Sequence, residues 1–246
     1  MSTGKSPIRL YVTSDLKADQ GVFLDRSQAH YVGNVMRRQV GDPVILFNGR
    51  NGEWSGEFQE IKKNAALVHV MELLREQKAE PDLRLYFSPL KKTQTSLVIQ
   101  KATELGVSEI YPVLTSRTNA EKIRLDKMEL QALEASEQCE RLTIPVIHKP
   151  MKLDQVLTGL EADRTLVFCN ERSDEGNTIK ALQPFIGSTK VAILIGPEGG
   201  FSKEEADKIA SLENCVPVTL GPRVLRAETA AISVITLVQS VLGDWQ

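Results

Sequence analysis

The chain has 246 residues, of which 41% are hydrophobic and 25% are charged, as is typical of a globular protein with a substantial core. Its formal net charge of −2 excludes a protein that attracts nucleic acid through a strongly basic overall field, so RNA contacts would depend on local basic patches. The three cysteines, Cys139, Cys169 and Cys215, lie far apart without paired spacing. They indicate neither a disulfide framework nor a zinc site, and they favour a reduced, cytoplasmic protein.

The sequence predicts a small, mostly β domain over residues 1–74. Short apolar runs indicate strands at 8–12, 44–48, 53–59 and 66–72, and the run NGRNG at 48–52 is typical of a hairpin turn. Apolar residues at helical spacing indicate a helix over residues 27–38, which ends in Arg37 and Arg38.

A second domain is predicted over residues 82–246, after the polar run EQKAEP at 76–81, which we interpret as a linker. Strands and helices then alternate, which favours a parallel sheet covered by helices. We expect strands at 83–88, 109–114, 165–169, 191–195 and 216–220, and helices at 93–105, 126–139, 154–160, 178–185, from 202 onward and at 227–242.

Two segments near the end of the chain share one pattern: a buried strand, a Gly-Pro turn and the start of a helix. In the first, Ser202 and Glu205 form a capping-box signature after a glycine-rich loop. Loops at the carboxyl ends of parallel strands often bind ligands, so these two could form walls of one pocket, although such loops can also be simple tight turns. Neither matches the dinucleotide fingerprint or the P-loop, so the patterns alone leave the ligand open.

The residues of these two segments resemble a known family. Residues 194–202 read LIGPEGGFS and residues 220–230 read LGPRVLRAETA, which is similar to the RsmE family of 16S ribosomal RNA uridine-N3 methyltransferases. That family belongs to the SPOUT superfamily of S-adenosylmethionine enzymes. The resemblance implies an α/β fold with an N-terminal PUA-like β-barrel and a C-terminal SPOUT domain tied in a trefoil knot. The knot is implied by the resemblance alone.

Other stretches resemble the same family and imply contacts with RNA. They are HYVGNVMRRQVGDPV at 30–44, which resembles the PUA-like barrel, PLKKTQTSLVIQKATELGVSEI at 89–110, SRTN at 116–119 and SEQCERLTIP at 136–145. For each basic or polar residue there, an exposed side chain without a ligand is the alternative, and Arg37 and Arg38 would also suit a helix end. The RNA-binding candidates are Arg9, His30, Arg37, Arg38, Lys91, Lys92, Lys101, Arg117, Gln138 and Arg141.

The resemblance also implies the site and its chemistry. Arg226, Glu228 and Glu198 are the catalytic candidates: the arginine would steady a uracil anion or a phosphate, and the glutamates would organise the site or accept a proton. Glu228 would equally suit a purely structural place in the first turn of a helix, and the base stays open between a side chain, RNA phosphate and water. The cofactor-binding candidates are Asn170, Leu194, Ile195, Gly196, Pro197, Glu198, Gly200, Leu220, Gly221, Val224, Leu225, Arg226, Thr229 and Ala230.

The implied partner is 16S rRNA within the small ribosomal subunit, with S-adenosylmethionine as cofactor and a homodimer formed near the apolar helix at 227–242. The three histidines lie apart without metal-ligand spacing, so we expect no metal. No stretch predicts a signal peptide or a membrane span, and a cytoplasmic protein is expected. Alternatives are a related methyltransferase acting on another RNA position, a non-catalytic RNA-binding homologue and a nucleotide-phosphate enzyme.

Overall fold

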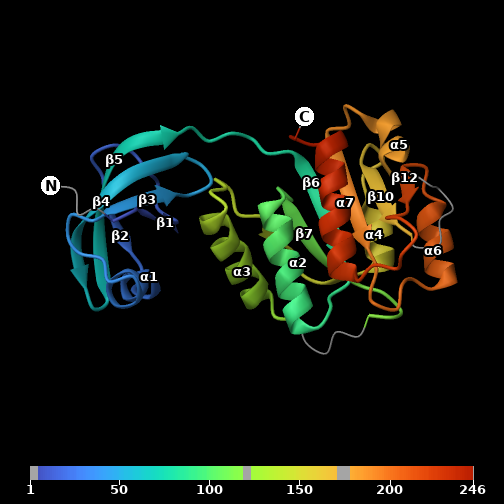
Figure 1. Ribbon diagram of the computed structural model, residues 1–246, viewed down its shortest axis with the longest axis horizontal. Coiled ribbons are helices and arrows are strands. Elements are labelled where there is room, and N and C mark those ends of the chain that lie inside the picture. Colours follow the sequence, from blue (N-terminus) through green and yellow to red (C-terminus); the bar gives the residue numbers. More distant parts are fainter. Residues whose placement is uncertain (1–4, 119–122, 171–177, 246) are drawn as a thin grey trace. The chain divides into compact units, whose positions relative to one another are not determined.

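The computed structural model describes residues 5–118, 123–170 and 178–245 and divides into two compact units (Figure 1). Unit 1 comprises the chain up to Ala79 together with Ser136–Ile144, and unit 2 comprises Glu80–Ala135 and Pro145–Gln246. We expected domains at 1–74 and 82–246, whereas these units meet between Ala79 and Glu80, within the expected linker. The structure groups the short segment Ser136–Ile144 with the N-terminal residues.

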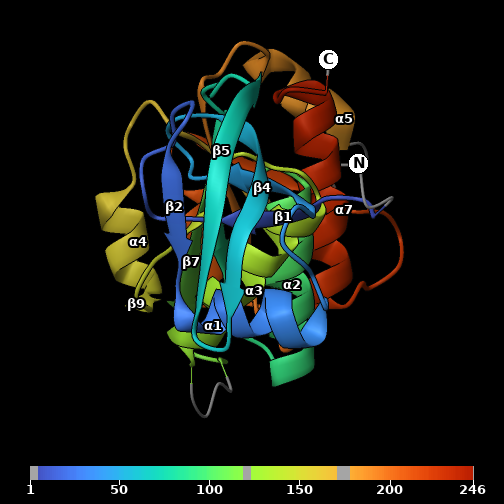
Figure 2. The same ribbon diagram turned by 90° about the vertical axis from the view of Figure 1, so that its left-hand side faces the viewer.

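Unit 1 is built on a five-stranded sheet with the order β1-β3-β4-β5-β2. β1 and β3 are parallel, whereas β4 pairs with both β3 and β5 in antiparallel fashion. The two long strands β4 and β5 lie side by side, with β2 beside β5 (Figure 2). The elements are β1 Ile8–Tyr11, β2 Gly21–Leu24, α1 Arg26–His30, the π-helical turn η1 Tyr31–Val35, β3 Pro43–Phe47, β4 Glu53–Lys62 and β5 Ala65–Arg75.

The expected strands of unit 1 are confirmed, but the expected helix over residues 27–38 is wrong in length and form. It begins at an Asp25 capping box, changes to a π-helical turn at Tyr31 and ends at Val35. Arg37 follows with a left-handed φ of 49°, so the Arg37–Arg38 pair lies beyond the helix. Strand β2 was not predicted.

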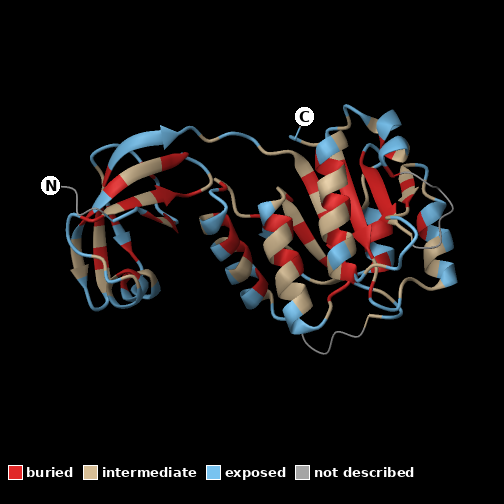
Figure 3. Cartoon of the chain, in the orientation of Figure 1, coloured by how far each residue is buried: buried red, intermediate tan, exposed pale blue. Residues whose placement is uncertain are grey.

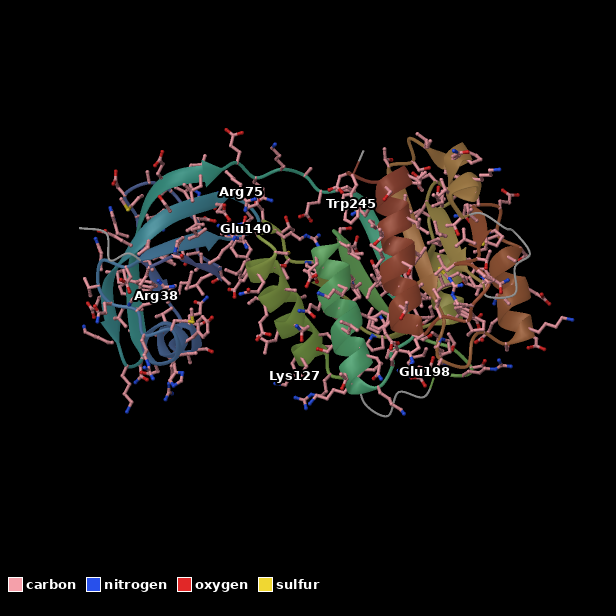
Figure 4. The ribbon with its side chains drawn as sticks, viewed as in Figure 1. Arg38, Arg75, Lys127, Glu140, Glu198 and Trp245 are labelled. Carbon is pink, nitrogen blue, oxygen red and sulfur yellow. The ribbon has the colours of Figure 1, made fainter. Side chains whose placement is uncertain are left out.

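An ion-pair cluster, in which Arg9 and Glu53 are buried and Arg75 is partly exposed, joins the sheet of unit 1 to the segment Ser136–Ile144. The Glu53 carboxylate accepts hydrogen bonds from Nε of Arg9 and Nε of Arg75, each of 2.6 Å. Arg9 also donates to the carbonyls of Ser136 and Arg141, at 2.7 and 2.6 Å. Arg75 donates to the carbonyl of Glu140 at 2.7 Å, and Figure 4 shows the two residues close together.

Unit 2 contains a parallel sheet with the order β12-β10-β11-β6-β7-β8, and β9 pairs separately with β7. This confirms the parallel sheet predicted from the alternating elements. Its elements are β6 Asp82–Phe87, α2 Lys92–Glu104, β7 Glu109–Leu114, α3 Leu125–Gln138, β8 Val146–Ile147, β9 Met151–Lys152, α4 Leu153–Gly159, β10 Thr165–Cys169, α5 Thr178–Leu182, η2 Gln183–Phe185, β11 Lys190–Ile195, α6 Lys203–Ala210, β12 Cys215–Val218 and α7 Ala227–Val241. The last turn of α3 is grouped with unit 1.

Helices cover the sheet of unit 2, as alternating side chains on its strands require. On one face, α4 and α6 pack through Val156 and Ile209 against strand residues such as Phe168 and Leu194. Helices α2 and α7 lie side by side, and α7 also contacts β11 (Figure 1). The central strands are buried along most of their length (Figure 3). No helix among the described residues is long and apolar enough to cross a membrane.

The amino ends of these strands carry an ion-pair network. Arg164, whose side chain is fully buried, donates to the carboxylates of Asp82 at 2.7 Å and Glu161 at 2.9 Å. Arg84 on β6 donates to Glu161 at 2.9 Å and to Glu109 on β7 at 3.2 Å. Because every partner belongs to the start of a strand or the turn before one, the network fixes this edge of the sheet and leaves the opposite, carboxyl edge to the two Gly-Pro loops.

Candidate functional site

The two Gly-Pro loops line one pocket in unit 2. The first pocket loop (residues 196–202) joins β11 to α6, and the second pocket loop (residues 219–226) joins β12 to α7. Since β11 and β12 both flank β10, their loops emerge at the same edge of the parallel sheet. The cavity has a volume of about 1100 Å³ and is also lined by the end of β10 and the start of α2. A cavity of this size accommodates a nucleoside-sized ligand.

The first pocket loop is shaped by its glycines and closed by a helix cap. Gly200 has a left-handed φ of 67°, and a Cβ on Gly196 would lie 2.7 Å from the ring of Phe201. Larger residues would be strained or would clash at these positions. Ser202 caps α6: its side chain accepts from the Glu205 amide at 3.1 Å, while Glu205 accepts from the Ser202 amide at 2.9 Å. The predicted capping box is thereby confirmed.

The second pocket loop ends at the amino terminus of α7. Gly221 has a left-handed φ of 100°, and Arg226 is the N-cap residue of the helix. Its side chain makes no capping hydrogen bond and lines the pocket, and Glu228 follows in the first helical turn. The helix dipole therefore adds positive potential at the place where Arg226 already lies.

Most of the predicted site residues lie together in this pocket. Leu194 and Thr229 are not among the residues that line it: Leu194 is fully buried on β11 in the core against α4 and α6, and Thr229 is exposed on α7. Figure 4 labels Glu198 on the first pocket loop. The predicted residues that line the pocket are Asn170, Ile195, Gly196, Pro197, Glu198, Gly200, Leu220, Gly221, Val224, Leu225, Arg226, Glu228 and Ala230.

Charges of both signs surround the cavity. Lys91, Lys203, Arg223 and Arg226 supply cations, while Glu198, Asp207 and Glu228 supply anions. Cys169 also lines the pocket, and burial raises the pKa of its thiol to about 12. At neutral pH this thiol is protonated and is therefore a poor nucleophile. Among the residues that the structure describes, no group of three or more His, Cys, Asp or Glu side chains is placed to hold a metal ion.

The RNA-binding candidates of unit 2 have different surroundings. Lys91 lines the pocket, and Lys92 is exposed at the first turn of α2. Lys101 pairs with Glu104 at 2.8 Å. Arg117 is exposed, but one of its guanidinium nitrogens donates to carbonyls of the first pocket loop. Asn119, the last residue of the SRTN stretch that contains Arg117, lies outside the described residues.

In unit 1 some of the RNA-binding candidates are exposed and others are buried. His30, Arg37 and Gln138 are exposed. Arg38 is half-buried, and its Nε and Nη1 atoms are buried without a hydrogen-bond partner in the described part of the chain. Arg9 and Arg141 are buried. Because all three groups of the Arg9 guanidinium bond within unit 1, we assign it a structural role and do not carry it forward as an RNA contact.

Several pocket residues were missed from the sequence. They are Lys203, Asp207, Thr219 and Arg223, together with Phe201, next to the glycine-rich loop, and Gln94, one turn into α2. Lys91 and Gln94 belong to the same resembling stretch and are three residues apart, which is one helical turn. That spacing places Gln94 on the same side of the helix as Lys91 and could have identified it as a pocket residue.

Comparison with known proteins agrees with this geometry. Residues 77–239 match a family model described as an RNA methyltransferase domain, and residues 24–71 match an RNA methyltransferase PUA domain. The ribosomal RNA small subunit methyltransferase E of Rickettsia conorii is 33% identical over 96% of each chain. The chain belongs to the ribosomal RNA small subunit methyltransferase E family. The membership inferred from the two loop motifs is thereby confirmed.

Solved structures place this methyltransferase E family member in the same fold. A Legionella pneumophila protein described as a methyltransferase, in complex with bound S-adenosylmethionine, is 32% identical with a TM-score of 0.85. It covers 98% of this chain and 100% of its own. The methyltransferase E of Neisseria gonorrhoeae bound to S-adenosylmethionine has a TM-score of 0.89, covers 98% of this chain and 100% of its own, and at 24% identity shows the fold alone.

The residues of the pocket fit S-adenosylmethionine. Exposed loop backbone at the glycines offers amide and carbonyl groups to an adenine, and Ile195, Val218 and Leu225 offer apolar surface. Carboxylates line the same cavity and would balance a sulfonium or ammonium charge. The cofactor joins a nucleoside to a charged amino acid, so its site needs polar and apolar groups for the nucleoside and charged groups for the amino acid.

Proposed function

We propose that this enzyme methylates N3 of a uridine of 16S rRNA in the small ribosomal subunit. Its cofactor is S-adenosylmethionine, which supplies the methyl group on a sulfonium that is already a good leaving group. The proposal is supported by family membership and, above all, by one observation. The two loops that carry the family's motifs, with Glu198 on the first and Arg226 on the second, line a single pocket together with Glu228 of α7.

In the proposed reaction the chain's task is to bind, align and control charge. N3 of uracil is an imide nitrogen that is a poor nucleophile until its proton leaves, and the resulting negative charge spreads over O2 and O4. Arg226, with the amino end of α7 behind it, is suited to stabilise that charge, and Lys91 and Gln94 line the same cavity as further donors. Arginine stays protonated, so it cannot be the base.

Glu198 and Glu228 remain the candidate proton acceptors. Both line the pocket, Glu198 exposed on the first loop and Glu228 half-buried in the first turn of α7. Glu228 lies in the first turn of α7, where an acidic side chain interacts favourably with the helix dipole and has a structural role without any proton transfer. We therefore place Glu198 first as proton acceptor and Glu228 as a residue that orients the site.

The target uridine must be unpaired or flipped out of a helix, because N3 lies on the Watson–Crick edge. We propose that unit 1 holds the surrounding RNA, with His30, Arg37, Arg38 and Gln138 among its contacts, and that Lys91 and Lys92 contact phosphate near the pocket. We also propose that the five-stranded sheet closes as a barrel, that the SPOUT domain is knotted, and that the protein works in the cytoplasm as a homodimer.

The test is methyl transfer from labelled S-adenosylmethionine to small ribosomal subunits from a strain that lacks this gene, with deproteinised 16S RNA in parallel. Label is expected in the RNA of the subunits. Arg226→Ala should lower kcat about 100-fold at saturating cofactor, since removal of one donor to a developing anion costs about that much. Cofactor binding without label in either substrate would refute the proposed target.

A further inference from the structure

The turn that follows β7 contacts the first pocket loop from outside the cavity. Arg117 Nη1 donates to the carbonyl of Gly199 at 2.9 Å and to the carbonyl of Phe201 at 3.3 Å. The turn itself is closed by the Thr118 hydroxyl, which accepts from the Thr115 amide at 2.8 Å. Arg117 therefore connects a turn that is stabilised by its own hydrogen bonds to the first pocket loop.

A second contact holds the end of the same loop. The Ser116 amide donates to one oxygen of Glu205 at 2.7 Å, and its hydroxyl donates to the other at 2.9 Å. Glu205 also accepts from the Ser202 amide, which completes the helix cap of α6. One carboxylate thus joins the turn after β7 to the point where the pocket loop becomes a helix.

These contacts fix the backbone of the loop without entering the cavity. Glu198 and Gly200 line the pocket, whereas Gly199 between them is not among the described residues that do. A Cβ on Gly199 would lie 3.7 Å from Cδ of Arg117, so the arginine's methylene groups lie within van der Waals distance of this glycine position, which is otherwise exposed. Because a peptide unit is planar, fixing the carbonyls of Gly199 and Phe201 also fixes the amides that follow them.

We infer that Arg117 and Ser116 are positioning residues for the cofactor pocket, and that Arg117 is not primarily an RNA ligand. The inference rests on the proposed use of this pocket for S-adenosylmethionine. A glycine-rich loop is mobile when free, so ordering it on binding costs conformational entropy. A loop already held in its bound shape avoids that cost and binds the cofactor more tightly.

The experiment compares Arg117→Ala with Arg124→Ala. Arg124 is an exposed arginine of the same unit that pairs with Asp126 at 2.7 Å, which makes it a matched loss of one positive charge. Cofactor affinity is measured by titration calorimetry on the full-length protein. Arg117→Ala should bind S-adenosylmethionine about tenfold more weakly, equivalent to about 1.4 kcal/mol, and Arg124→Ala should bind like wild type. Arg117→Lys, which keeps a donor, should recover part of the loss.

Kinetics with small ribosomal subunits separate positioning from RNA binding. Arg117→Ala should raise the KM for S-adenosylmethionine, whereas the kcat at saturating cofactor, the KM for subunits and its salt dependence should stay within about twofold of wild type. An RNA contact would instead weaken subunit binding and reduce the salt slope by about one. Should Arg117→Ala fail to fold, Ser116→Ala, which keeps the amide contact, provides a milder variant that should shift cofactor affinity in the same direction.

Two results would overturn the inference: unchanged cofactor affinity in a folded Arg117→Ala protein, or a loss confined to the KM for subunits. If wild-type protein itself binds no S-adenosylmethionine, the proposed function fails first. The two failures are therefore distinguishable from the wild-type titration alone.

Discussion

Glu53 accepts a 2.6 Å hydrogen bond from Arg9 in the interior of unit 1, where both side chains are less than a tenth exposed. Burial alone raises the pKa of Glu53, but hydrogen bonds from Arg75 and Arg9 outweigh it, so the net pKa is lowered and the carboxylate stays ionised. Arg9 and Glu53 therefore form a buried ion pair in which each charge depends on the other.

Arg9→Met should destabilise the protein by about 3 kcal/mol, because it leaves part of the charge of Glu53 uncompensated in the interior. Arg26→Met, a change at an exposed arginine of the same unit, should alter stability by less than about 0.5 kcal/mol. Urea unfolding of both variants makes the comparison. If Arg9→Met unfolds like wild type yet binds ribosomal subunits more weakly, Arg9 contacts RNA after all.

The burial of Arg9 shows where prediction from the sequence ends. Ile8 and Leu10 are buried, so strand alternation places Arg9 on the opposite face, where an arginine normally meets solvent. That face is instead covered by a segment whose carbonyl acceptor at Ser136 comes 127 residues later. No local pattern reveals such a contact.

Local patterns did predict most elements and the pocket. Strands β7 and β10 have the predicted bounds, and the Ser202 cap was readable because its determinants lie within four residues. Strand β2 was missed because it has four residues, begins with glycine and exposes Phe23, so its alternation is too short to recognise. The helix from residue 27 was overextended, since helical spacing cannot show where the chain changes to a π-helical turn.

The ion pair between Glu161 and Arg164 should make the stability of the protein depend on pH. A hydrogen bond from Arg164 lowers the pKa of Glu161 from 4.5 to about 2. Because the folded pKa is depressed, this group stabilises the fold above about pH 4.5 and loses that contribution as the pH falls toward 2. The side chain is about a third exposed, so we expect a screened contribution of about 1 kcal/mol at pH 7.

Glu161→Gln should accordingly be less stable than wild type at pH 7, and the two proteins should converge near pH 2. Asp163→Asn, which removes an exposed pair with Lys190, should change stability little at any pH. Chemical denaturation at a series of pH values tests both. A constant difference between Glu161→Gln and wild type down to pH 2 would contradict the assignment.

Gly106 should tolerate no side chain. It follows α2 with a φ of +84°, and a Cβ there would lie 2.5 Å from Nε2 of the buried Gln239, which donates to the carbonyl of Leu105. Gly106→Ala should destabilise by about 1–3 kcal/mol. Gly159→Ala, where nothing lies within 4 Å of the added methyl, should be neutral or slightly stabilising. Equal melting temperatures for the two variants would show that Gly106 is not constrained.

Thiol labelling should distinguish the cysteines. Cys139 is exposed and should react with iodoacetamide at pH 8, whereas Cys169, with a pKa raised to about 12 by burial, should react at least about 100-fold more slowly because little thiolate is present. Mass spectrometry of the labelled peptides reads out each site, and urea-unfolded protein should label both. Comparable rates in the folded protein would mean that Cys169 is more accessible and more acidic than its surroundings imply.

We propose that the pocket directs methyl transfer to N3 of one uridine. The most direct test is to digest subunit RNA labelled by this enzyme to nucleosides and to identify the labelled species by chromatography and mass. We expect 3-methyluridine from a single nucleotide, at which reverse transcription stops because the Watson–Crick edge is blocked. Label recovered as a ribose-methylated or C5-methylated nucleoside would contradict it.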